Sequence, residues 1–253
     1  MELRNVLKFN IIASLIINFR MFSFRDALRL PVIVFGKLKI GKLTGRIILT
    51  CPIRRGLIRI GQNAEMNCST TNSSYLSIEG EWYIDGQVVL GRDVALIIKN
   101  TAKFYMGDGS CLRNRTKSII TRDVRFGRYV RLSHDSSMMT SNFHYMVDTN
   151  TGMVGRMDKE IMIGDYCWIS NNCTIMPGTV IPPYTIVASH SMVNKDFSHL
   201  EKYSVIGGTP ARFLKSGVAR VFNTDAERVI QQYFDTHPDA DEYNASDLDI
   251  YYS

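Results

Sequence analysis

A period of six residues constrains the fold more than any other feature of this sequence. Branched apolar residues occupy every sixth position from Ile163 to Val193, and a small residue stands four positions after each of the first five, namely Cys167, Cys173, Thr179, Thr185 and Ser191. A helix repeats at about 3.6 residues and a strand at about 2, so neither explains this period. Short strands separated by turns do explain it, because three such sides close a triangular prism in which equivalent side chains stack inward. The sequence therefore predicts an all-β solenoid.

The same spacing recurs upstream, over 78–90 and 120–138, with a slip of register between Ile98 and Lys117 that predicts bulges or short loops. The 25 residues from Met138 to Ile163 are not a multiple of six, which predicts that residues 141–160 are expelled as a polar loop. A loop on a rigid scaffold is a common place for functional side chains.

The two ends of the chain differ in charge. Residues 1–60 carry twelve bases against two acids (+10), whereas residues 224–253 carry eight acids against Arg228 (−7). We expect a helical and basic segment at 1–55, the β-helix at 56–215, and a C-terminal helix with an acidic tail at 216–253. Length alone permits one substantial core.

An apolar stretch between Asn5 and Phe24 is interrupted by Asn10, Asn18 and Arg20. It is shorter than the ~20 apolar residues of a spanning helix. We expect an amphipathic helix that caps the first open coil or rests on an anionic membrane, and both alternatives stay open at this point. A cytoplasmic protein, peripheral to the inner face of the membrane if the helix contacts lipid, is the corresponding expectation.

Five cysteines, at positions 51, 68, 111, 167 and 173, form no CxxC pair. They predict reduced thiols that fill space in a cytoplasmic protein. The basic N-terminal segment lacks the interleaved aromatic and basic residues of a nucleic-acid-binding module, so no nucleic-acid partner is expected.

Four blocks between Ile161 and Lys215 read IMIGDYCWIS, IMPGTVIP, VASHSMVNKD and IGGTPARFLK. In combination they resemble the hexapeptide-repeat acyltransferases, in particular galactoside, maltose and polysaccharide O-acetyltransferases. The resemblance implies a left-handed parallel β-helix and a homotrimer with acetyl-CoA between neighbouring prisms. The sequence departs from the family at Ser170, where glycine is usual, and at Ser189-His190, where small residues are usual, which affects the expected fit of the pantetheine arm.

Transfer of an acetyl group to a hydroxyl requires a base, and histidine suits this role near neutral pH. His144 lies in the expelled loop, upstream of the IGD block, where the family has its catalytic histidine. Asp148, four residues later, is expected to hold the imidazole tautomer. Asn114 and His134 are candidates for binding the acceptor, although a structural role for His134 is the stronger alternative.

The resemblance also implies a set of residues that contact acetyl-CoA. Trp168 and Asn171 would lie near the thioester, and Ser189 and Asn194 near pantetheine. Lys195 and Arg212 would lie near the phosphates. Cationic side chains pair well with phosphate oxygens.

The sequence thus predicts an acetyl-CoA-dependent O-acetyltransferase that acts on a sugar hydroxyl of a surface polysaccharide or its precursor. An N-acetyltransferase for an amino-sugar nucleotide and a non-catalytic β-helix scaffold are the alternatives. A γ-type carbonic anhydrase shares the prism, but its paired zinc histidines are five residues apart, whereas His134 and His144 are ten apart. No metal is therefore expected.

Overall fold

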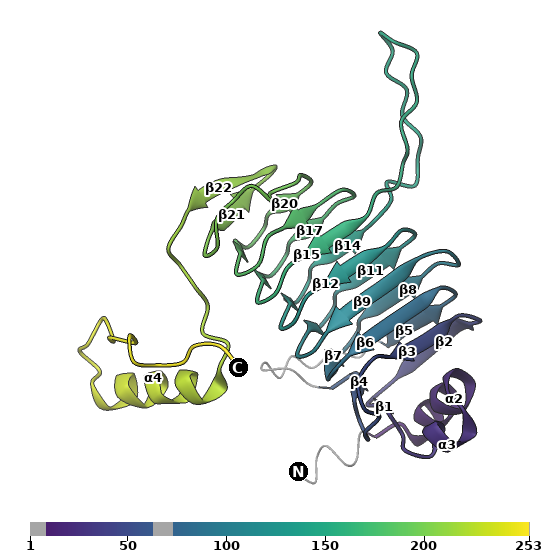
Figure 1. The fold of residues 1–253 in the computed structure, drawn as a ribbon, viewed down its shortest axis with the longest axis horizontal. Coiled ribbons are helices and arrows are strands. Elements are labelled where there is room, and N and C mark those ends of the chain that lie inside the picture. The colour runs from purple at the N-terminus through teal and green to yellow at the C-terminus, as the bar shows by residue number, and fades with distance from the viewer. Residues whose placement is uncertain (1–8, 63–72, 253) are drawn as a thin grey trace.

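The computed structural model describes residues 9–62 and 73–252, and within these residues the chain winds into a three-sided β-helix (Figure 1). Successive strands join three sheets in turn, and all pairings along the coils are parallel, which confirms the predicted left-handed parallel β-helix class. The first residues of the predicted N-terminal segment and Cys68 lie outside the described residues.

Strands of successive coils stack in three sheets of nine, seven and six strands. The first sheet contains, in order, β1 (Val32–Val34), β4 (Ile58–Ile60), β7 (Val88–Leu90), β10 (Cys111–Leu112), β13 (Arg131–Leu132), β16 (Trp168–Ile169), β19 (Ile186–Val187), β21 (Val205–Gly208) and the antiparallel β22 (Ala211–Lys215). The second contains β2 (Leu38–Leu43), β5 (Ser74–Ile78), β8 (Ala95–Ile98), β11 (Lys117–Ile120), β14 (Ser137–Met139), β17 (Thr174–Ile175) and β20 (Met192–Val193). The third contains β3 (Arg46–Leu49), β6 (Glu81–Asp85), β9 (Lys103–Gly107), β12 (Val124–Phe126), β15 (Ile161–Ile163) and β18 (Val180–Ile181).

The coils become shorter toward the C-terminus. The register pairs Leu90 with Leu112, Leu112 with Leu132, and Ile169 with Val187, so one coil takes 22, 20 and 18 residues respectively. The slip of register that the sequence shows between Ile98 and Lys117 therefore reflects a longer coil, whose strand β9 spans five residues. The solenoid also begins before the predicted boundary at residue 56, because β1, β2 and β3 pair in register with the following coil.

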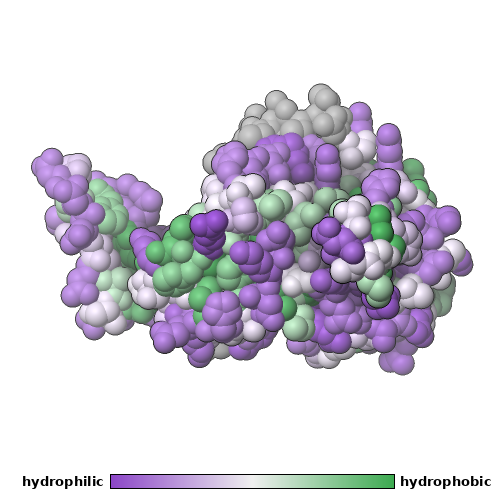
Figure 2. All heavy atoms as spheres, turned by 90° about the horizontal axis from the view of Figure 1, so that it is seen from above, coloured by the Kyte–Doolittle hydropathy of each residue, from purple (hydrophilic) through white to green (hydrophobic). Residues whose placement is uncertain are grey.

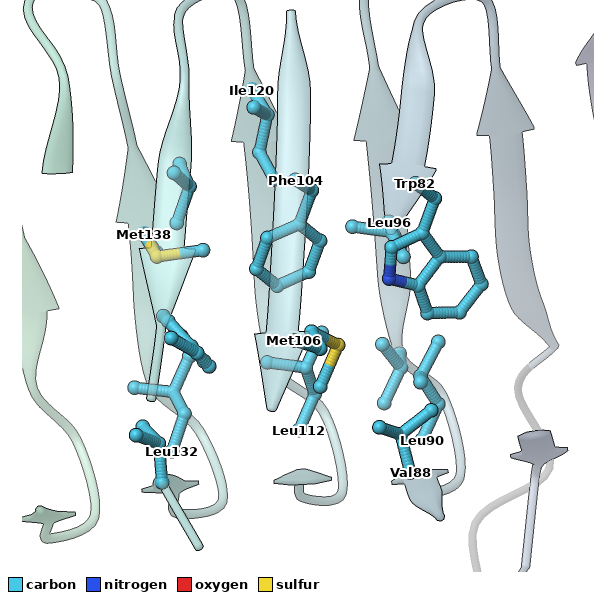
Figure 3. Packing of buried hydrophobic residues seen from close by; sticks show 14 of the residues in the cluster. Trp82, Val88, Leu90, Leu96, Phe104, Met106, Leu112, Ile120, Leu132 and Met138 are labelled. Carbon is cyan, nitrogen blue, oxygen red and sulfur yellow. The ribbon is translucent and has the colours of Figure 1, made fainter. Parts of the chain in front are cut away.

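Large aromatic side chains fill the wider N-terminal coils (Figure 3). Trp82 and Phe104 are fully buried with ring centroids 6.4 Å apart, and Phe126 follows with its ring edge toward Phe104 at 5.2 Å. The shorter coils need only aliphatic residues such as Ile169 and Val187. A longer coil encloses a wider interior, and close packing requires larger side chains there.

The small residues that follow the branched apolar positions by four, such as Cys167 and Thr179, also form hydrogen bonds between coils. The Cys167 thiol donates to the Pro182 carbonyl at 3.1 Å, and the Thr179 hydroxyl donates to the Val193 carbonyl at 2.8 Å. Both acceptors belong to the following coil. Burial raises the pKa of the Cys167 thiol to about 12, so this cysteine is inert as a nucleophile.

Helix α2 (Ile11–Met21), followed by the short α3 (Phe24–Ala27), covers the open N-terminal edge of the first sheet (Figure 1). The Asn18 carboxamide donates to the Val32 carbonyl at 2.7 Å and accepts from the Val32 amide at 3.0 Å, and the Ser14 hydroxyl accepts from the Val34 amide at 3.0 Å. These bonds satisfy strand groups that would otherwise pair with a foreign strand. The capping role expected for this helix is therefore present in the structure.

At the other end, α4 (Thr224–Thr236) begins at the N-cap Asn223 and stands away from the coils (Figure 1). The tail beyond it returns to a stack of corner tyrosines. Tyr252 stacks on Tyr129 with centroids 5.0 Å apart, and Tyr251 meets Tyr166 edge-on at 4.9 Å. Within the described residues, no helix is both long and apolar enough to cross a bilayer.

Candidate active site

Turns between the first and second sheets form one polar edge of the solenoid, which we call the polar corner: residues 113–115, 133–135, 170–172 and 188–190. Backbone bonds link successive turns, since the Asn172 amide donates to the His134 carbonyl at 3.2 Å and the His190 amide donates to the Asn171 carbonyl at 3.1 Å. Four predicted site residues that are far apart in sequence, Asn114, His134, Asn171 and Ser189, thereby share this corner.

Side chains of the polar corner contact one another. The Ser189 hydroxyl donates to the Asn171 carboxamide oxygen at 2.8 Å. The indole of Trp168, at the start of β16, donates to the Ser133 hydroxyl at 3.0 Å, and the Arg220 guanidinium carbon lies 5.0 Å from the centre of the indole ring. The indole is thus oriented by a serine from the preceding coil and stacked by a cation from the C-terminal segment.

His134 belongs to a charged network. Its Nδ1 lies 2.8 Å from Asp135 Oδ2, and the Arg115 guanidinium holds both carboxylate oxygens of Asp135 at 2.6 Å. The hydrogen bonds from Arg115, followed by that from His134, lower the pKa of Asp135 to about 2. A carboxylate so held is ionised near neutral pH and favours a proton on the Nδ1 of His134.

Asn114 has a structural contact in the same corner. It is 7% exposed, and its carboxamide oxygen accepts from the Arg92 amide at 3.0 Å. This bond ties the turn after β7 to the turn after β10. Acceptor binding by Asn114 stays a prediction.

The residues predicted to meet the coenzyme phosphates divide between two places. Arg212 is exposed on β22, in the hairpin whose Thr209 hydroxyl donates to the His190 carbonyl at 3.3 Å, so this hairpin adjoins the polar corner. Asn194 and Lys195 are exposed at the next corner, between the second and third sheets. One side of the prism therefore separates Lys195 from Ser189.

The expelled loop forms a narrow two-stranded arm that projects from this next corner (Figure 1). Isolated antiparallel bridges join Ser141 to Asp158 and Val147 to Val154. The arm exposes several large apolar side chains, among them Tyr145, Met146 and Met153, each about 70% exposed. From above, where the arm points toward the viewer, apolar residues are interleaved with hydrophilic ones (Figure 2).

His144 is exposed on this arm. The arm leaves the solenoid between the second and third sheets, whereas the polar corner lies between the first and second. Asp148 does not orient it as the sequence predicts: the Asp148 carboxylate accepts from the Asn150 and Thr151 amides at 2.8 and 3.1 Å, which lowers its pKa and closes the turn at the tip. In the described part of the chain no hydrogen bond joins Asp148 to His144. The physical reason is that a turn of Asp, Thr and Asn satisfies its own carboxylate locally.

Sequence reasoning does not identify three members of this region: Ser133, Asp135 and Arg220. Asp135 adjoins the candidate His134, so a His-Asp pair next to a turn is a usable signal. Arg220 lies outside the repeat, and no pattern in the sequence connects it with Trp168.

No family model matches the chain. It is 27% identical over 201 residues to an uncharacterized 24.8 kDa protein in the cps region of Klebsiella pneumoniae, covering 79% of this chain and 86% of that protein. It is 23% identical over 173 residues to a probable acetyltransferase of Mycobacterium tuberculosis, which covers 65% of this chain but only 51% of the relative.

Two solved structures also resemble it. The polysialic-acid-specific acetyltransferase NeuO has a TM-score of 0.49 at 15% identity and covers 82% of this chain and 95% of its own. A hexapeptide-repeat-containing acetyltransferase of Vibrio cholerae, in complex with acetyl-CoA, has a TM-score of 0.38 at 26% identity, with 45% and 60% covered. The relatives in sequence thus include a probable acetyltransferase, in agreement with the resemblance predicted from the repeat and motifs.

Proposed function

We propose that this chain is an acetyl-CoA-dependent O-acetyltransferase that acts on a sugar hydroxyl of a surface polysaccharide or its precursor. One observation carries the proposal: Asn171, Ser189 and the Arg212 hairpin, which resemble the family's coenzyme-binding positions, meet at the polar corner through hydrogen bonds of 2.8 and 3.3 Å. The similarity to a probable acetyltransferase supports it. The sugar acceptor rests on the resemblance of residues 161–215 to polysaccharide O-acetyltransferases.

In the proposed reaction, Nε2 of His144 removes the proton of the acceptor hydroxyl while the hydroxyl oxygen attacks the thioester carbonyl. The carbon–sulfur bond then breaks. The acetyl group remains on the sugar oxygen, and the coenzyme thiolate leaves and takes the proton from the imidazolium. Asn171 would hydrogen-bond the thioester, and the Trp168 indole would form one wall of the site.

The reaction requires His144 to meet a polar corner, and that of its own chain is distant. We infer a homotrimer in which the arm of one copy reaches the polar corner of the next. The exposed apolar residues of the arm support this inference, because Tyr145, Met146 and Met153 would be covered at such a junction.

The proposed function is tested by incubating the purified full-length protein with acetyl-CoA and a panel of oligosaccharides. The expected result is release of coenzyme thiol that depends on the acceptor, together with an acetyl ester detected on the sugar by mass spectrometry. Absence of acetyl-CoA binding at millimolar concentration would exclude the proposal and favour a scaffold. Transfer only to sugar amines would favour the N-acetyltransferase alternative.

For the coenzyme, we expect Arg212→Ala to raise the KM for acetyl-CoA by about tenfold while turnover changes by less than about twofold. A charge-assisted bond to phosphate is worth about 1.5 kcal/mol or more, and it acts on ground and transition states alike. Lys195→Ala should have a smaller effect of the same kind. Steady-state kinetics at low and high salt check this, since screening weakens both contacts.

Lys215→Ala is the matched control, because Lys215 is exposed on the same strand, β22, three residues from Arg212. If all three variants share the KM of the unmodified protein at low salt, the phosphates bind elsewhere.

A further inference from the structure

Capping accounts for only one side of α2. The residues of this helix that face the coils are buried, namely Ala13, Ser14, Ile17 and Asn18. The opposite side exposes Ile11, Ile12, Leu15, Ile16 and Phe19 at 41–73%, and Phe24 and Leu28 continue the surface at 72% and 58%. We call these seven residues the outer face. A cap needs no apolar residues on the side that faces away from the coils.

Basic residues adjoin the outer face along the chain. Arg20, Arg25 and Arg29 are exposed beside it, and the Arg20 Nε donates to the Leu43 carbonyl at 3.1 Å. Residues 9–62 hold ten lysines and arginines against a single acid, Asp26, a balance of +9. The carboxylate of Asp26 accepts a hydrogen bond from the Ser23 hydroxyl at 2.7 Å.

The apolar side chains of the outer face and the neighbouring arginines favour an anionic bilayer over a second copy of the chain as the binding partner. A second copy of the chain, placed face to face, would bring two basic ends together, and like charges oppose such a contact. An anionic bilayer offers both complements at once: an acyl region for the apolar side chains and phosphates for the arginines. Helix α2 has 11 residues, so it fits lying in the headgroup plane.

We propose that the outer face docks the solenoid, N-terminal end down, on an anionic lipid surface. This docking is independent of the proposed acetyl transfer. It uses α2 twice, because one side of the helix closes the first coil while the other enters the lipid. The solenoid is rigid, so the arm and the polar corner would be held at a set height above the bilayer.

The test is flotation of the full chain with vesicles of phosphatidylcholine, with and without phosphatidylglycerol. We expect binding to the anionic vesicles and little to the neutral ones. Ile12→Ser with Ile16→Ser should lower the partition coefficient by at least about tenfold, because two inserted apolar side chains are lost. Arg25→Gln with Arg29→Gln should lower it by about tenfold on anionic vesicles only.

Leu214→Ser with Val229→Ser is the matched control, since these residues are 55% and 45% exposed and lie far along the chain on β22 and α4. It should bind vesicles within about twofold of the unmodified protein. All variants should keep the unmodified melting temperature, because every altered side chain is exposed. Failure of the unmodified chain to bind anionic vesicles overturns the proposal, as does equal binding by the Ile12→Ser, Ile16→Ser variant. If the unmodified chain does not bind vesicles and the Ile12→Ser, Ile16→Ser variant has a lower mass in solution than the unmodified chain, the outer face is instead an interface with a second copy.

Discussion

Replacing His144 with alanine is expected to lower turnover by about 10²-fold or more, the usual scale for loss of a general base. The side chain is exposed, and no described residue of the arm belongs to the hydrophobic core, so the melting temperature and the affinity for acetyl-CoA should stay nearly unchanged. Steady-state kinetics with a verified acceptor measure the first quantity, and thermal unfolding with coenzyme titration measures the others.

Two controls make the result specific. His199→Ala removes another exposed histidine and should retain full activity. His134→Ala tests a competing imidazole of the polar corner, whose Nδ1 lies 2.8 Å from the Asp135 carboxylate. If His134→Ala abolishes turnover while His144→Ala retains it, the base lies in the corner and not on the arm.

Mixing two inactive variants tests whether the arm acts on a neighbouring copy. In the proposed trimer, mixing His144→Ala with Asn171→Ala chains leaves some junctions with an intact arm and an intact polar corner, and these should restore part of the activity. Co-expression with two affinity tags isolates such mixtures. Complete inactivity of the mixed trimers would mean that His144 and Asn171 of one chain form the site together.

The second large effect is expected at the cap. Asn18 is fully buried, and its carboxamide bonds both the amide and the carbonyl of Val32. Asn18→Leu preserves much of the shape but leaves two buried backbone groups without partners, each at a cost of about 1–3 kcal/mol. We expect a fall in melting temperature of about 5–10 °C for a chain of this size.

Thermal unfolding followed by circular dichroism, at one protein concentration for all variants, measures this fall. Ile12→Ser on the exposed side of the same helix is the control and should melt like the unmodified protein. A melting temperature for Asn18→Leu within about 2 °C of the unmodified value would show that water replaces the lost partners and that the cap is not needed there.

Several features of the site were open to prediction from sequence because they belong to the repeat. Asn171 and Ser189 are 18 residues apart, which is one coil, so their proximity follows from the period. The bond between Trp168 and Ser133 does not follow from it, because these residues are 35 apart and the arm lies between them. Arg220 reaches the same indole from beyond the last coil, through a segment without any period.

By itself, the sequence determined the solenoid and the expelled arm. A period of six places one apolar side chain per side at the same inward position, and a spacing of 25 residues cannot be absorbed without extrusion. It also indicated an amphipathic helix between Asn5 and Phe24, but Asn18 there looks like an interruption of an apolar stretch. Only the tertiary structure shows that this asparagine is buried, where it completes the edge strand β1.

Tertiary structure alone also decided where the first coil begins, how wide each coil is and which groups Asp148 and Asp135 bind. The coils before Leu132 take 20 residues or more, which hides the period of six in the sequence even though the stacking inside is the same. Asp148 closes its own turn, whereas Asp135 binds Arg115 across 20 residues, and nothing in their local sequences distinguishes the two. Periodicity is a property of neighbouring positions along the chain, and it therefore predicts what stacks, but a hydrogen bond between coils depends on where each turn directs its side chains.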